Sequence, residues 1–378
     1  MRKIKAAVVY EYRAPLKVEE VELDDEPKAG EVLVKVLASG LCHSDIHPWK
    51  GDMPIKLPCV LGHEGAGIVE AVGEGVTMVK PGDHVVMSVV SYCGKCPHCV
   101  SGKPYICSVT PMTFFSGLLP DGTTRLKTKD GRDIRHWFSQ ASFAEYIIVA
   151  ERQAVKVRDD APLDTVCLLS CGASTGIGAV LNAAEVKAGE SVAVFGCGGV
   201  GLCIIMAAKL VGANPIIAVD VFDNKLEMAK QLGATHLINS TKINLKDLSR
   251  WVVELGGIAP RGVDYTFDAV GNTNLQILSV ALLAQGGTAV LVGGADPAGA
   301  DPFTFNALAP HMIPGRTIKG TSSGNIIPSI DIPRYVDLFM DGRIPLDKLV
   351  TRKYPLEQIN EAIKAVLDGQ VMRCVIIP

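Results

Sequence analysis

The stretch Ser191-Val-Ala-Val-Phe-Gly-Cys-Gly-Gly-Val-Gly201 decides the fold of the second half of the chain. Its first part is apolar and predicts a buried strand. The segment from Gly196 to Gly201 fits the pattern G-x-G-x-x-G and leads into a predicted helix over residues 200–211. A second apolar run ends in Asp220, 24 residues after Gly196. Strand, glycine turn, helix and acid in this order predict a Rossmann dinucleotide-binding unit.

The residues of this turn have separate physical roles. Gly196 permits a tight turn, Gly198 lets the backbone approach a pyrophosphate, and Gly201 lets the helix pack close to the sheet. The helix N-terminus at Gly199 and Val200 presents unpaired N–H groups and a positive dipole end to the phosphates. The alternative is a glycine-rich turn without a ligand.

Asp220 decides which dinucleotide is expected. Its carboxylate can accept hydrogen bonds from both ribose hydroxyls, and its charge repels a 2′-phosphate. The sequence therefore favours NAD over NADP as the cofactor.

The hydrophobic pattern divides the chain into two parts. From about Ala173 onward, apolar strands alternate with helical stretches, which indicates βαβ units and a parallel sheet. The first 170 residues instead carry short strands separated by Gly and Pro, which indicates an antiparallel barrel or sandwich. Residues 111–140 are polar and irregular and read as a long surface loop, and the chain closes with an amphipathic helix over 356–367 and a strand over 373–377.

Charge and cysteine content exclude several classes. The 378 residues include 37 Lys and Arg and 40 Asp and Glu, so the formal charge is −3, which argues against a nucleic-acid or anionic-membrane binder. The N-terminal apolar run ends at Glu11 and is too short for a signal peptide. The expected location is therefore cytoplasmic, with reduced thiols. Eleven cysteines in such a long chain point to ligand or nucleophile roles rather than to a disulfide framework.

Four of these cysteines lie within fifteen residues: Cys93, Cys96, Cys99 and Cys107. Four thiolates from one loop suit a closed, tetrahedral structural zinc site. An iron–sulfur cluster is the first alternative, but the fourth cysteine does not have the bacterial ferredoxin spacing and no second run follows. A redox C-x-x-C site is the other alternative, and it lacks the thioredoxin βαβ context.

Three further candidate ligands are scattered along the chain. Cys42 follows a predicted strand, His63 lies in Leu61-Gly-His-Glu-Gly-Ala-Gly67, and Cys171 precedes a predicted helix. They are 21 and 108 residues apart, so spacing alone cannot join them. Taken singly, each cysteine is interpreted as a buried small apolar residue.

Together these motifs resemble the zinc-dependent medium-chain alcohol dehydrogenases over about residues 4–378. The resemblance rests on Cys42-His-Ser-Asp45, Gly62-His-Glu64 with Gly67 and Gly73, Cys171, the four-cysteine run and the glycine turn. It implies an α/β protein in which a β-rich, co-chaperonin-like barrel domain is followed by a Rossmann domain with a doubly wound parallel sheet. The implied bounds are 1–172, completed by 316–378, for the catalytic domain, and 173–315 for the NAD-binding domain.

The resemblance also assigns roles to individual residues. Cys42, His63 and Cys171 are implied ligands of a catalytic zinc whose fourth position takes water or substrate. Asp45 would orient His63, and Glu64 would lie near the metal. Ser44 would take the alcohol proton and pass it through the nicotinamide ribose to His47, while hydride moves to NAD. The implied cofactor contacts are His43 and Arg373 to the pyrophosphate, Thr175 to the nicotinamide side and Lys225 to the adenosine ribose.

The expected partners are small molecules: an alcohol or aldehyde, NAD and two zinc ions per chain. Relatives form dimers or tetramers, so a homodimer or homotetramer is expected, with no nucleic acid and no membrane. A non-catalytic dinucleotide-binding protein remains an alternative class, which the intact set of implied ligands disfavours.

The walls of the substrate pocket, assigned by resemblance, are apolar and favour aliphatic, allylic or aromatic alcohols. They are Trp49, Met53, Val89, Phe114 and Val292. Related glutathione-linked formaldehyde dehydrogenases grip glutathione with an Asp and an Arg, and this chain carries Met53 and Pro111 near those positions. Oxidation of an apolar alcohol is therefore the main prediction. The alternatives are a glutathione-linked formaldehyde dehydrogenase and an enzyme whose tightly held NAD is recycled by an external acceptor.

Overall fold

The chain forms two compact units in the computed structural model, which describes residues 1–53, 55–109, 115–244, 247–294 and 315–378. One unit comprises Met1–Ser174, Ile326–Gly342 and Leu346–Pro378. The other comprises Thr175–Asn325 and Arg343–Pro345. The predicted fold class is confirmed: a β-rich barrel unit accompanies a unit built on a parallel sheet.

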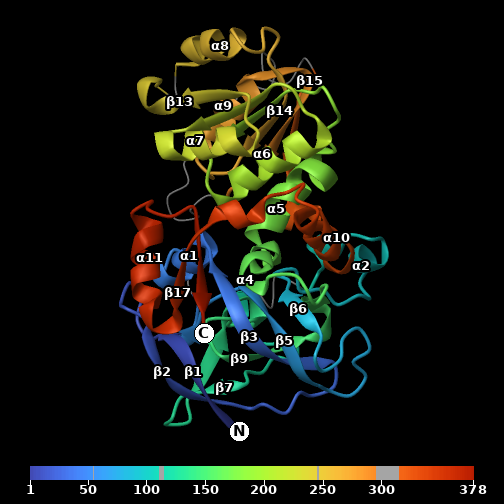
Figure 1. The fold of residues 1–378 in the computed structure, drawn as a ribbon, viewed down its shortest axis with the longest axis vertical. Helices are drawn as coiled ribbons and strands as arrows, with labels where there is room; N and C mark the ends of the chain where they lie inside the picture. The colour runs from blue at the N-terminus through green and yellow to red at the C-terminus, as the bar shows by residue number, and fades with distance from the viewer. Residues whose placement is uncertain (54, 110–114, 245–246, 295–314) are drawn as a thin grey trace. The chain divides into compact units, whose positions relative to one another are not determined.

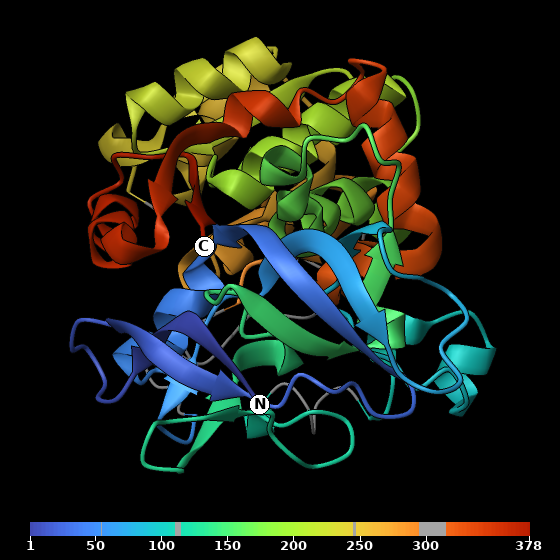
Figure 2. The ribbon, with the colours of Figure 1, turned by 60° about the horizontal axis from the view of Figure 1, so that its bottom comes forward.

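The first unit contains a closed barrel of short strands. In spatial order these are β1 (Arg2–Val9), β2 (Lys17–Leu23), β7 (Leu126–Lys127), β8 (Asp133–His136) and β4 (Cys59–Val60). Alternate side chains of a strand point to one face, and here Ile4 and Val21 pair across β1 and β2 in a fully buried position. Figure 2 shows the dark-blue N-terminal strands next to green segments from later in the chain.

A second sheet in the same unit combines strands from the first part of the chain with two strands from its end. Its main path runs β10 (Ala154–Lys156), β6 (His84–Met87), β5 (Glu64–Val72), β3 (Glu31–Leu41), β18 (Arg373–Ile377) and β17 (Val350–Pro355), and β9 (Tyr146–Ala150) also pairs with β3. Figure 1 shows the red β17 in this blue-to-green region, and the register sets Cys374 of β18 opposite Leu41 of β3. The last two strands of the chain therefore complete a sheet whose other strands lie within residues 31–156.

Helices cover this unit between and after the strands. They are α1 (His43–Lys50), α2 (Pro97–Val100), α4 (Leu163–Val166), α10 (Pro328–Met340) and α11 (Ile359–Leu367). Helix α5 (Gly172–Gly178) spans the boundary between the two units at Ser174. The predicted amphipathic helix corresponds to a 3-10 turn, Leu356–Gln358, followed by α11, whose Ile359, Ala362 and Ile363 are buried.

The second unit is a six-stranded sheet in which every neighbouring pair is parallel. Numbered by sequence, the strands lie in the order 3-2-1-4-5-6, which is the doubly wound Rossmann order. They are β11 (Val192–Phe195), β12 (Ile216–Asp220), β13 (His236–Asn239), β14 (Val263–Asp268), β15 (Leu283–Leu291) and β16 (Thr317–Gly320). The helices are α6 (Gly199–Val211), α7 (Asp223–Leu232), α8 (Leu248–Gly256) and α9 (Thr273–Ala281), labelled in Figure 1.

The position of strand β16 does not agree with the domain boundary that we expect between residues 315 and 316. We assigned residues 316–378 to the catalytic domain, but Thr317–Gly320 pairs with β15 as the edge strand of the parallel sheet, and the second unit extends to Asn325. The reason is that ladder hydrogen bonds to β15 hold this short segment, although its own side chains are mostly exposed.

The expected surface loop over 111–140 also differs from the structure in its described part. Residues Leu126–Lys127 and Asp133–His136 are barrel strands, and Trp137 is buried. Buried Arg125 pairs with Glu31 through two hydrogen bonds, at 2.6 and 3.3 Å, which lets a polar segment lie inside the fold. Residues 110–114 lie outside the described residues.

Buried His136 predicts acid sensitivity of this barrel. Its Nε2 accepts the Arg125 backbone N–H at 3.1 Å, and burial, aided by the Arg125 charge, lowers the pKa of His136 to about 3. Below pH about 6.5 the unfolded chain therefore binds a proton that the folded chain does not, and stability is lost as the pH falls toward 3. In urea unfolding at pH 7 and pH 5, we expect His136→Gln to lose less stability than wild type, by at least about 1 kcal/mol. Equal losses in the two proteins would show that His136 is not responsible.

Within the described ranges, no single helix is long and apolar enough to cross a membrane, although the bent pair Leu163–Ser170 and Gly172–Ala184 reaches the length and composition together.

Candidate active site

Four residues predicted to lie at the catalytic metal converge in the first unit. The ligand atoms of Cys42, His63, Glu64 and Cys171 all lie within 4.8 Å of one another. Cys42 follows β3 and caps α1, His63 directly precedes β5, Glu64 begins β5, and Cys171 lies between a 3-10 turn and α5. Loops at the ends of neighbouring elements thus bring together residues that are distant in sequence.

Asp45, in the first turn of α1, holds the geometry of this cluster. One carboxylate oxygen lies 2.8 Å from Nδ1 of His63 and also accepts the Gly62 N–H at 3.0 Å. The other oxygen accepts the Cys42 N–H at 3.1 Å. Asp45 is 1% exposed, so these bonds operate in a low-dielectric interior. A single buried carboxylate therefore positions two of the candidate ligands.

The chemistry of the cluster fits a zinc ion. His63 is fully buried, and its Nε2 has no hydrogen-bond partner among the described residues, although Nδ1 is bonded to Asp45. The pKa of the Cys42 thiol lies well below its usual range, because Cys171 stabilises the thiolate and outweighs the effect of burial. A buried imidazole nitrogen without a partner and two adjoining sulfurs are the donor set that catalytic zinc uses.

Glu64 and Arg373 form a buried ion pair beside the cluster. One Glu64 oxygen accepts the Gly172 N–H at 2.9 Å and the other pairs with Arg373, which begins β18. Burial raises the pKa of Glu64 to about 7, although the Arg373 guanidinium opposes the rise. The Arg373 guanidinium is paired with Glu64 here. Its expected contact with a pyrophosphate stays a prediction.

Helix α1 carries the residues expected to move the proton. Ser44 and His47 are three positions apart, so they share one face of the helix. Ser44 Oγ lies 3.9 Å from Cys42 Sγ, and His47 Nδ1 lies 3.6 Å from Asp52. His43 begins the helix and is exposed. The structure thus places Ser44 beside the cluster, while the relay to His47 stays a prediction.

Loss of the Asp45 charge is expected to weaken metal binding. We expect Asp45→Asn to lower zinc affinity by about 10- to 100-fold, because the amide is a poorer acceptor from His63 and Cys42. Chelator competition measures this. Asp52→Asn, which lies two residues after the same helix, is half-buried and stands outside the cluster, is the matched control and should bind zinc as wild type does. Equal affinities for Asp45→Asn and wild type would contradict the role of Asp45.

The four-cysteine run forms a second cluster in the first unit. The sulfurs of Cys93, Cys96, Cys99 and Cys107 all lie within 4.8 Å of one another, around helix α2. The backbone N–H groups of Cys99 and Ser108 lower the pKa of Cys96 to about 5. The pKa of Cys107 is also lowered, against the effect of burial, by backbone N–H groups that include Cys93, 3.3 Å away. Backbone donors that stabilise thiolates suit a closed metal site.

The glycine turn of the second unit has the close approaches that its sequence predicts. Gly196 has φ +90°, a conformation that favours glycine. A Cβ on Gly201 would lie 1.8 Å from the Gly196 carbonyl oxygen, so only glycine lets α6 (Gly199–Val211) pack there. A Cβ on Gly198 would instead meet open space, on the residue that caps the helix. The backbone of the turn is therefore open on the side of Gly198.

Asp220, the last residue of β12, is hydrogen-bonded to the backbone of this turn. It accepts the Cys197 N–H at 2.7 Å on one oxygen and the Val221 and Phe222 N–H groups on the other. Lys225 lies 4.8 Å from the centroid of the Phe222 ring. The roles of Asp220, Lys225 and Thr175 toward a ribose or nicotinamide stay predictions.

The structure also reveals residues near these sites that we did not predict. Phe138 packs against the His63 ring, with centroids 4.8 Å apart. Asp268, at the end of β14, accepts the Val270 and Gly271 N–H groups and so shapes the loop next to Gly196. Neither residue belongs to a recognisable motif, although the position of Asp268 at the end of an apolar strand is a signal that could have found it.

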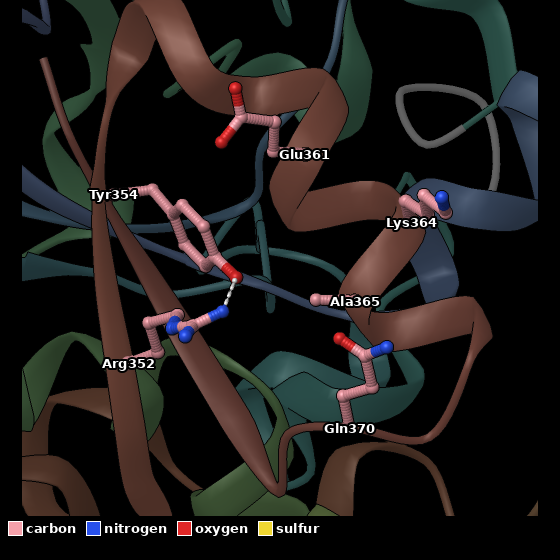
Figure 3. Close-up of a pocket in the computed structure, with 6 residues that line it drawn as sticks. All are labelled: Arg352, Tyr354, Glu361, Lys364, Ala365 and Gln370. Carbon is pink, nitrogen blue, oxygen red and sulfur yellow. Dashed lines mark hydrogen bonds between the residues drawn. The ribbon is translucent and has the colours of Figure 1, made fainter.

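The predicted substrate residues are only partly described. Val89 is buried, Trp49 and Met53 pack against the core of the first unit, and Val292 follows β15 in the second unit. Phe114 and Pro111 lie outside the described residues. A cavity of about 220 Å³ elsewhere on the first unit contains no predicted site residue. Figure 3 shows its lining, which includes Arg352 bonded to the Tyr354 hydroxyl at 3.1 Å.

Comparison with known families agrees with this geometry. Residues 28–159 match the alcohol dehydrogenase GroES-like domain, and residues 199–341 match the zinc-binding dehydrogenase domain. The chain is 40% identical to an S-(hydroxymethyl)glutathione dehydrogenase of Saccharomyces cerevisiae, covering 98% of this chain and 95% of the relative. The chain belongs to the zinc-dependent medium-chain alcohol dehydrogenases. The resemblance seen in the sequence is thereby confirmed.

Further relatives within this dehydrogenase family carry different names. A class-3 alcohol dehydrogenase of Dictyostelium discoideum is 39% identical, covering 98% of this chain and 97% of the relative. The crystal structure of benzyl alcohol dehydrogenase from Acinetobacter calcoaceticus is 37% identical with a TM-score of 0.92, covering 100% and 99% of the two chains. The glutathione-linked names among these relatives favour our alternative over the apolar alcohol that we predicted first.

Proposed function

We propose that this dehydrogenase transfers a hydride between an alcohol and NAD, at a zinc held by Cys42, His63 and Cys171. The observation that carries the proposal is the convergence of these ligand atoms, with Glu64, within 4.8 Å. Cys93, Cys96, Cys99 and Cys107 are proposed to hold a second, structural zinc. Three protein ligands suit an open site for substrate, whereas four cysteines suit a closed one.

The residues around the open site divide the work of the reaction. Zinc bound there would lower the pKa of the substrate alcohol. Asp45 fixes the His63 imidazole through Nδ1 and leaves Nε2 directed away from that bond. Ser44, beside Cys42, is placed to accept the hydroxyl proton and pass it on toward His47.

The second unit is proposed to bind the dinucleotide that accepts the hydride. Its phosphates would lie over Gly198, where the backbone is open, against the N-terminus of α6 (Gly199–Val211). The Asp220 carboxylate lies at the end of the neighbouring strand, where it would bind ribose hydroxyls and repel a 2′-phosphate. These features support NAD rather than NADP.

Two substrate classes are supported by different observations. The curated relatives favour S-(hydroxymethyl)glutathione. The half-buried Met53, which packs against the apolar core near the end of α1, favours an apolar alcohol, as does the similarity to benzyl alcohol dehydrogenase. A carboxylate-bearing substrate would gain no ion pair from a methionine.

A substrate panel distinguishes the two classes. Initial rates of reduced-cofactor formation are measured with benzyl alcohol, an aliphatic alcohol, and formaldehyde with and without glutathione, each with NAD and with NADP. We expect NAD to be used at least about 10-fold better than NADP, because Asp220 repels the 2′-phosphate. Formaldehyde oxidation that requires glutathione would establish the glutathione-linked reaction. A higher kcat/KM for benzyl alcohol would establish the apolar one, and no turnover of any alcohol would contradict the proposal.

A further inference from the structure

A strained backbone segment lies next to the candidate metal cluster. Phe138, Ser139 and Ala141 have φ of 53°, 57° and 63°, in the left-handed region that non-glycine residues rarely adopt. We call residues 137–141 the arch. Such a conformation persists only where its surroundings impose it, and clusters of this kind are typical of functional sites.

Buried hydrogen bonds impose this conformation from several sides. The Gln140 amide donates to the carbonyls of Met87 and Ser88 at 3.1 and 3.0 Å. The Gln153 amide donates to the Phe138 carbonyl at 3.2 Å, and both glutamines are fully buried. The arch is therefore fastened to strand β6 and to the loop that follows it.

The two residues that directly follow the arch are hydrogen-bonded to the loop that carries His63. The Ser142 N–H donates to the Gly62 carbonyl at 2.9 Å, and the Phe143 N–H donates to the Leu61 carbonyl at 3.1 Å. A Cβ on Gly62 would lie 2.6 Å from the Phe143 nitrogen, so the two segments are in close contact. The position of the arch and the position of His63 are thus linked through backbone atoms.

The left-handed turn brings the Phe138 ring onto the imidazole of His63. The two ring centroids lie 4.8 Å apart with an interplanar angle of 35°, and Trp137 packs edge-on against Phe138 at 4.5 Å. Asp45 already holds one edge of the imidazole, and the Ser170 hydroxyl bonds to the His63 carbonyl at 2.7 Å. Phe138 supplies the remaining support, on the face of the ring.

We propose that the arch is a positioning device and that Phe138 is a positioning residue, which sets the plane of the His63 imidazole for the metal. The inference rests on the proposed function, since it requires a metal at the Cys42, His63 and Cys171 cluster. Asp45 restrains Nδ1 but leaves the ring free to tilt about that hydrogen bond. The Phe138 face blocks the tilt, and so keeps the Nε2 lone pair directed at the cluster.

Cobalt substitution tests this inference by spectroscopy rather than by turnover. Zinc is exchanged for Co²⁺, and the ligand-field bands and the rate of Co²⁺ loss to a chelator are recorded for wild type, Phe138→Leu and Phe138→Tyr. The four-cysteine cluster contributes the same bands to each protein, so difference spectra report the His63 site. We expect Phe138→Leu to shift these bands and to lose Co²⁺ about 10-fold faster, whereas Phe138→Tyr retains an aromatic face and should match wild type.

A matched control separates positioning from general destabilisation. Phe195→Leu removes a fully buried ring in the second unit, where Phe195 packs against Trp251, and should leave the cobalt bands unchanged. Wild-type bands and release rate in Phe138→Leu would overturn the inference while leaving the proposed function intact. Absence of Co²⁺ at the cluster in wild type would overturn both. If Phe138→Leu does not fold, Phe138→Met takes its place and is expected to show the same band shift.

Discussion

Turnover of alcohol is expected to fall by at least about 10⁴-fold in Cys42→Ala, because the variant loses one of the ligands that hold the open metal site. Cys42 is buried, its N–H is bonded to Asp45, and its sulfur belongs to the cluster with His63 and Cys171. Removing one thiolate leaves two protein ligands, which is too few to retain a catalytic zinc. Zinc content should drop by about one per chain, to about one, and kcat should be near the detection limit.

The four-cysteine cluster should be untouched in that variant, since it lies on a separate loop around α2 (Pro97–Val100). Cys59→Ala is the matched control: Cys59 is a fully buried free thiol in β4 and belongs to neither cluster. We expect Cys59→Ala to keep both zinc ions and to retain its turnover within about 2-fold. The variant loses one buried sulfur outside both clusters, and such a change acts mainly on stability. Full activity in Cys42→Ala would show that the assigned catalytic site is wrong.

The second large effect is expected at the glycine turn. Gly201→Ala should weaken NAD binding by at least about 100-fold, or about 2.7 kcal/mol. The new Cβ would lie 1.8 Å from the Gly196 carbonyl oxygen, a backbone atom that cannot rotate away. Helix α6 must then shift, and its N-terminal N–H groups no longer face the phosphates. Titration of NAD by calorimetry or by fluorescence measures the loss.

Gly198→Ala distinguishes a ligand site from a structural turn. The new Cβ meets open space, and φ of −77° with ψ of −170° suits alanine, so the free energy of unfolding should change by less than about 0.5 kcal/mol. A pyrophosphate that approaches the backbone there would meet the added methyl group, and we expect NAD to bind about 10-fold more weakly. Unchanged NAD affinity in Gly198→Ala would place the phosphates elsewhere.

Hydrophobic periodicity and turn residues predicted the parts of the fold in which the local sequence preference agrees with the tertiary structure. The parallel sheet, the glycine turn and helix α6 follow from apolar strands and a motif with a physical role for each glycine. The barrel strands β7 and β8 did not follow, because they are only two and four residues long and carry Arg, Lys and Asp. The Arg125–Glu31 ion pair next to β7 joins residues 94 positions apart, and no local pattern predicts such a contact.

Local sequence patterns likewise predict one part of the candidate site and not the other. Four cysteines in one loop predict a metal cluster from spacing, whereas Cys42, His63 and Cys171 could be joined only through resemblance to a family. The ion pair between Glu64 and Arg373 links residues 309 positions apart, and no local pattern encodes it. The left-handed conformation of Phe138 is set by buried hydrogen bonds from other segments, so sequence contained no turn signal for it.

Zinc analysis of freshly purified wild-type protein tests the central claim most directly, namely that the chain holds one open and one closed zinc site. The sulfur and nitrogen ligands form two separate clusters, one with His63 and one made only of cysteines. We therefore predict about two zinc ions per chain and no iron or acid-labile sulfide. One zinc or none, or iron with acid-labile sulfide, would contradict the account.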